Sequence, residues 1–133
     1  MKSLLIITAM LEAGVGLVLL LSPALPVALL LGTPLDTPGG MVAARIAGAA
    51  VLALGVACWR ARHDGQSRAG RVVVSAMLVY NLAVAAVLAY AWIELDLTGL
   101  GLRPAVGLHL ALAIWCGAGL RAVNPSSHER TPP

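Results

Sequence analysis

Five polar residues lie within long apolar stretches of this sequence, and their types could support chemistry. They are Glu12, Arg45, Tyr80, Asn81 and His109. A charge at the centre of a bilayer costs roughly 2.5–3.5 kcal/mol on insertion scales, so a carboxyl such as Glu12 needs a partner or a use. Proton exchange and the binding of a small ligand are the uses that a carboxyl in this setting allows. We therefore take these five residues as candidate binding residues.

Enzyme chemistry receives less support from the sequence. Thr8 and Ser75 are lone hydroxyls within the apolar stretches and are expected to bond to their own helix backbone, so no catalytic residue is predicted. Cys58 and Cys116 show no metal-ligand spacing and are interpreted as small apolar residues. His109 has no second histidine in any apolar stretch, so no metal site and no cofactor are predicted.

The composition predicts a membrane protein. Of the 133 residues, 59% are hydrophobic and 11% are charged, and the mean hydropathy is +0.90. A soluble domain is typically about 45–50% apolar and about 25% charged. The apolar residues form long blocks, which predict an all-α integral membrane four-helix bundle of up-down-up-down topology. Basic residues are few and are not interleaved with aromatic ones, so no nucleic acid partner is expected.

The blocks predict one four-span domain over residues 1–122. Its spans are expected at about 4–21, 38–59, 72–92 and 104–120. The apolar stretch 24–32 is too short to cross, which favours an interfacial segment capped by Gly32, although a kinked extension of the first span fits the same pattern. Thr37 and Pro38 are typical of a helix start. A polar tail, 123–133, is expected to be disordered.

The second predicted span carries many small residues. Gly48 and Gly55 are a heptad apart and share a helix face with Arg45, Leu52 and Trp59. Such a face permits close helix packing in lipid.

The basic residues predict the orientation. In a four-span alternation most of them fall on one side, namely Lys2, Arg60, Arg62, Arg68, Arg71, Arg121 and Arg130. The positive-inside rule then places both termini in the cytoplasm of a bacterium, with the spans in its inner membrane.

The orientation also predicts how the polar residues pair. Helical side chains tilt toward the N-terminus of their helix, so residues of spans one and three lean inward and those of spans two and four lean outward. We expect an inner pair of Glu12 and Asn81, with Thr8 one turn from Glu12 and Tyr80 nearby. We expect an outer pair of Arg45 and His109. If the second span begins at Pro38, Arg45 can instead reach Glu12.

Two families resemble this chain. Glu12 followed by Gly14 and Gly16 resembles the first span of the small multidrug resistance transporters, in which the membrane glutamate binds protons or a cationic drug. The chain lacks that family's tryptophan and glycine pattern in the third span. A broader resemblance, to small bacterial four-span proteins of the DoxX-like kind, covers most of the chain. It is carried by the polar first span, Leu31-Gly32, Arg45-Ile46-Ala47-Gly48, and Leu54-Gly55 before Trp59. This resemblance implies a fold and no chemistry.

Three functions are compatible with these features. The first is a structural or accessory subunit whose polar residues specify helix packing, with a second copy or a larger membrane complex as partner besides the lipid bilayer. The second is a proton-linked carrier or a small-molecule binder that uses Glu12. The third is a quinone- or lipid-interacting membrane enzyme with Tyr80 and His109 near its substrate.

Overall fold

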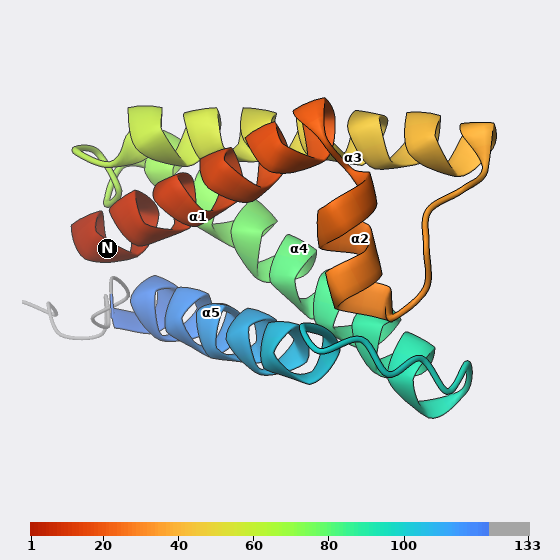
Figure 1. Ribbon diagram of the computed structural model, residues 1–133. Coiled ribbons are helices and arrows are strands. Elements are labelled where there is room, and N and C mark those ends of the chain that lie inside the picture. The colour runs from red at the N-terminus through yellow and green to blue at the C-terminus, as the bar shows by residue number, and fades with distance from the viewer. Residues whose placement is uncertain (123–133) are drawn as a thin grey trace, which may run out of the picture.

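The computed structural model describes residues 1–122, and its structure is all-helical (Figure 1). Five helices follow one another: α1 (Lys2–Leu21), α2 (Ala24–Leu31), α3 (Pro38–Ala61), α4 (Arg68–Ile93) and α5 (Leu102–Ala122). All except α2 are long and apolar enough to cross a membrane. The predicted tail, 123–133, lies outside the described residues.

The helix ends follow local chemistry. Ser22 and Pro23 separate α1 from α2, so the two are distinct helices rather than one kinked span. Gly32 ends α2 as predicted, with a φ of 76° that glycine adopts without steric cost. The Thr37 hydroxyl accepts a hydrogen bond from the Gly40 nitrogen at 3.1 Å and caps α3, again as predicted. Ser67 caps α4 in the same way at 3.0 Å.

The long helices form two pairs, α1 with α3 and α4 with α5. In the first pair the two backbones are in close contact. A Cβ atom added at Gly48 would lie 2.6 Å from the Leu20 nitrogen, and one at Gly55 would lie 2.7 Å from the Ala13 nitrogen. Gly16 of α1 faces the backbone of Leu52 in the same manner. The predicted packing face of Gly48 and Gly55 is therefore confirmed.

A buried core joins the two pairs at one end of the molecule. All four long helices contribute to it through Leu4, Leu5, Ala9, Cys58, Val74, Met77 and Cys116. Beyond Glu12, the only buried residue of α1 is Gly16, which faces α3 rather than the other pair. The shared core therefore ends at about the level of Glu12.

Helix α2 connects the two pairs at the opposite end. Figure 1 shows it running crosswise to the long helices, between the end of α1 and the start of α5. The Gly101 nitrogen donates a hydrogen bond of 2.9 Å to the Leu29 carbonyl. Gly32 also packs against Gly99 so closely that neither position has room for a Cβ atom. The contacts fix α2 to the α4–α5 loop, while its location at a membrane interface stays a prediction.

Candidate functional site

The carboxyl of Glu12 lies inside the bundle and bonds to the opposite helix pair. Glu12 is 5% exposed. The Tyr80 hydroxyl donates a hydrogen bond to Glu12 Oε2 at 3.3 Å. Glu12 belongs to α1 and Tyr80 to α4, so this bond crosses from one pair to the other.

A second hydrogen-bonded unit holds α4 to α5. Asn81 is fully buried. Its Nδ2 donates to the Met77 carbonyl, one turn earlier in α4, at 2.7 Å. Its Oδ1 lies 2.8 Å from Nδ1 of His109. The amide therefore ties the imidazole of α5 to the backbone of α4.

The two units meet at Tyr80 and His109. Their rings lie edge to face, with centroids 5.9 Å apart and an interplanar angle of 80°. Successive residues of a helix point about 100° apart around its axis. Helix α4 can therefore direct Tyr80 toward α1 and Asn81 toward α5. Four of the five candidate residues thus form one group, the polar network of Glu12, Tyr80, Asn81 and His109.

The predicted partners within this network are wrong. Glu12 bonds to Tyr80 instead of Asn81, and Asn81 bonds to His109. The reason is the α4–α5 loop, which folds back on α4 so that the Leu97 nitrogen bonds to the Ala91 carbonyl. His109 therefore lies level with Asn81, although fewer residues separate His109 from the α4–α5 loop than separate Asn81 from it.

Arg45 stands apart from the network. Its side chain is exposed and joins none of the network's hydrogen bonds. The backbone of α1 runs opposite Gly48 at Leu20, near the C-terminal end of α1. Arg45 lies about one turn nearer the N-terminus of α3, where α3 extends past the C-terminal end of α1. The predicted pairs of Arg45 with His109 and with Glu12 are therefore not formed.

Thr8 is a further polar residue of α1 next to the polar network. It lies one helical turn before Glu12 and is 1% exposed. Its Oγ has no hydrogen-bond partner among residues 1–122. Buried hydroxyls normally have a partner. The position one turn before Glu12 is as predicted, but the expected hydrogen bond from the Thr8 hydroxyl to its own helix backbone is not formed.

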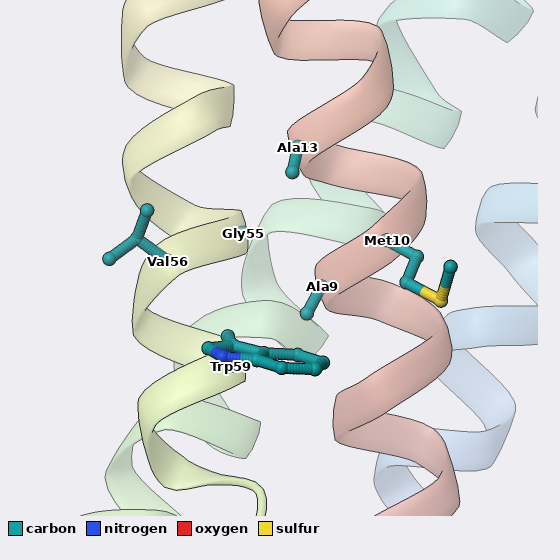
Figure 2. A pocket seen from close by; sticks show the side chains of 6 residues that line it. All are labelled: Ala9, Met10, Ala13, Gly55, Val56 and Trp59. Atoms are coloured by element: carbon teal, nitrogen blue, oxygen red, sulfur yellow. The ribbon is translucent and has the colours of Figure 1, made fainter.

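The grooves on the surface are separate from the polar network. Figure 2 shows one between α1 and α3, about 210 Å³ in volume and bordered by the Trp59 ring. Its lining is apolar and consists of Ala9, Met10, Ala13, Gly55, Val56 and Trp59. In the part of the chain that the structure describes, no three His, Cys, Asp or Glu side chains gather closely enough to hold a metal ion.

The side chains of the polar network can form hydrogen bonds and exchange protons. It combines a carboxyl, a phenol, an imidazole and an amide, and its hydrogen bonds join three helices. No basic side chain lies within hydrogen-bond distance of the Glu12 carboxyl in residues 1–122. No family model, curated protein or solved structure matches this chain.

Proposed function

We propose that the chain is a small polytopic protein of a bacterial inner membrane, with alternating spans and both termini in the cytoplasm. The Met1 side chain lies beside Gly65 of the α3–α4 loop and near Gly119 of α5, so these parts of the chain gather at one end. The basic residues that favour a cytoplasmic position for this end are Lys2, Arg60, Arg62, Arg68, Arg71 and Arg121.

Its proposed role is that of a structural or accessory subunit whose polar network specifies how the two helix pairs pack. The observation that carries this proposal is the hydrogen bond between Tyr80 and Glu12. Apolar side chains pack in many registers, whereas a polar group inside a membrane protein restricts the choice to arrangements that satisfy it. A second copy of the chain or a larger membrane complex is the proposed partner.

A double-mutant cycle tests this role. We expect Tyr80→Phe and Glu12→Met each to destabilise the protein and their combination to cost less than the sum. Intramembrane hydrogen bonds show coupling free energies of about 0.6 kcal/mol on average and about 1.7 kcal/mol at most. Reversible unfolding in mixed detergent micelles measures the coupling. Glu12→Gln is the matched control, because its amide oxygen can still accept the hydrogen bond from the Tyr80 hydroxyl. Zero coupling would remove the main support for the proposal.

A proton-linked carrier or small-molecule binder is the second candidate. It is favoured by the setting of Glu12, whose single hydrogen-bond partner within residues 1–122 is a neutral hydroxyl. In this function Glu12 exchanges its proton when conditions change. We expect the carboxyl band in infrared difference spectra to change between mildly acidic and alkaline buffers, and the change to disappear in Glu12→Gln. A band that is constant across these buffers argues against the carrier.

A further inference from the structure

A polar cavity of about 540 Å³ lies at the end of the molecule where α1 begins. The start of α1 and the α3–α4 loop line it. Its lining carries two cationic side chains, Lys2 and Arg62, with His63 beside them, against the single carboxylate of Asp64. Positive charge therefore exceeds negative charge around the cavity, which favours an anionic occupant.

Arg62 joins this cavity to the apolar groove between α1 and α3. The central carbon of its guanidinium lies 4.1 Å from the centroid of the Trp59 ring. That ring borders the groove, and Figure 2 shows it at the Ala9 end, which is the end nearer the start of α1. The groove, the Trp59 ring, Arg62 and the cavity therefore follow one another along the same helix pair.

This order of chemistry matches that of a phospholipid, in which acyl chains, ester groups and phosphate follow one another. Tryptophan is enriched at the level of the lipid headgroups, and basic residues attract the anionic lipids of the cytoplasmic leaflet. We infer that the cavity and the groove together bind one anionic phospholipid, with its phosphate between Lys2 and Arg62 and one acyl chain in the groove. The site rests on the proposed location and orientation of the chain in the membrane, and it adds a ligand that the proposed packing role does not require.

The guanidinium of Arg62 is held in place for such a ligand. One face of it lies on the Trp59 ring, and Nη1 donates a hydrogen bond of 2.6 Å to the Trp59 carbonyl. A guanidinium has five N–H groups, so the others can bind phosphate oxygens, where arginine commonly forms paired bonds. Asp64 can accept a hydrogen bond from a headgroup hydroxyl but repels a headgroup carboxylate. A glycerol headgroup, as in phosphatidylglycerol, therefore suits the cavity.

Native mass spectrometry of the full chain tests the preference without any variant. Offered equal amounts of phosphatidylglycerol and phosphatidylethanolamine with the same acyl chains, the protein should retain phosphatidylglycerol several-fold more. Lys2→Gln and Arg62→Gln should each reduce this preference. Arg103→Gln is the matched control, because Arg103 also lies over a tryptophan, 4.7 Å from the Trp92 centroid, but lines a different cavity. Equal retention of the two lipids by the wild type, or an equal effect of Arg103→Gln, overturns the proposal.

Fluorescence quenching then tests the groove. In a Trp92→Phe/Trp115→Phe background, Trp59 is the only tryptophan. In phosphatidylcholine vesicles, a small fraction of phosphatidylglycerol with brominated acyl chains should quench Trp59 several-fold more than the same fraction of brominated phosphatidylcholine. An excess of the water-soluble headgroup, glycerophosphoglycerol, should leave this difference in place.

The contrary outcomes of the quenching experiment separate the lipid site from the proposed function. Equal quenching by the two brominated lipids overturns the site and leaves the membrane location intact. A lack of quenching by both overturns the membrane location, and the site with it. Loss of the difference on adding glycerophosphoglycerol shows that the cavity takes a soluble phosphodiester, which overturns the lipid as occupant. None of these outcomes depends on the double-mutant cycle that tests packing.

Discussion

Gly48→Ala should cause a large loss of stability, because it forces apart the two most closely packed long helices. The added Cβ atom would lie 2.6 Å from the Leu20 nitrogen and 2.8 Å from the Gly16 oxygen. Both neighbours are backbone atoms, which cannot turn aside as a flexible side chain can. The α1 and α3 helices must separate, and overpacking of this kind costs typically about 1–3 kcal/mol or more. Unfolding in mixed micelles measures the loss.

Gly14→Ala provides the matched control for this change. Gly14 lies in α1, and a Cβ atom there would meet no atom within 4 Å. The substitution adds the same methyl group and the same helix propensity, so we expect it to leave stability unchanged or to raise it by up to about 1 kcal/mol. If Gly48→Ala and Gly14→Ala changed the free energy of unfolding equally, the close backbone contact between α1 and α3 at Gly48 would not contribute to stability.

Asn81→Leu should destabilise the protein nearly as much as Gly48→Ala. The leucine fills a similar volume but removes the hydrogen bonds to Met77 and His109. His109 Nδ1 then has no acceptor inside the bundle, and an unsatisfied buried polar group costs about 1–3 kcal/mol. We expect a lower unfolding midpoint and a smaller folded yield in detergent, because α4 and α5 lose their polar connection.

Ser75→Ala is the comparison for Asn81→Leu. Ser75 is also a polar residue of α4, but it is exposed. Surface substitutions of this kind usually change stability by less than about 0.5 kcal/mol. If the two variants unfold alike, the Asn81–His109 bond does not hold the second helix pair together.

Much of the fold could be predicted because its signals are local. The apolar blocks indicated four long helices, Gly32 and Thr37 marked helix ends, and the heptad spacing of Gly48 and Gly55 marked a packing face. Each inference depended on residues within a few turns of one another. The helices exceed the predicted spans by a few residues, since polar first and last turns still form helix.

The pairing of polar residues could not be predicted in this way, because it depends on the relative heights of separate helices. Counting residues from the predicted span ends placed His109 near the outer surface. The eight residues between α4 and α5 instead fold back along α4, which shifts α5 relative to it. The prediction also treated Tyr80 as a neighbour of the Glu12–Asn81 pair. Adjacent residues on a helix face different partners, and Tyr80 proved to be the residue that bonds to Glu12.

The contact of α2 with Gly99 and Gly101 has a consequence for the order of assembly. The partners of α2 are made after α4, so α2 has no docking site while the first half of the chain is synthesised. The α1–α3 pair can form at that stage, because its small-residue contacts lie wholly within residues 1–61. Docking of α2 must then wait for the α4–α5 loop. A chain truncated before residue 99 should therefore be cleaved within residues 24–32 faster than the intact chain, because α2 then lacks its contacts with Gly99 and Gly101.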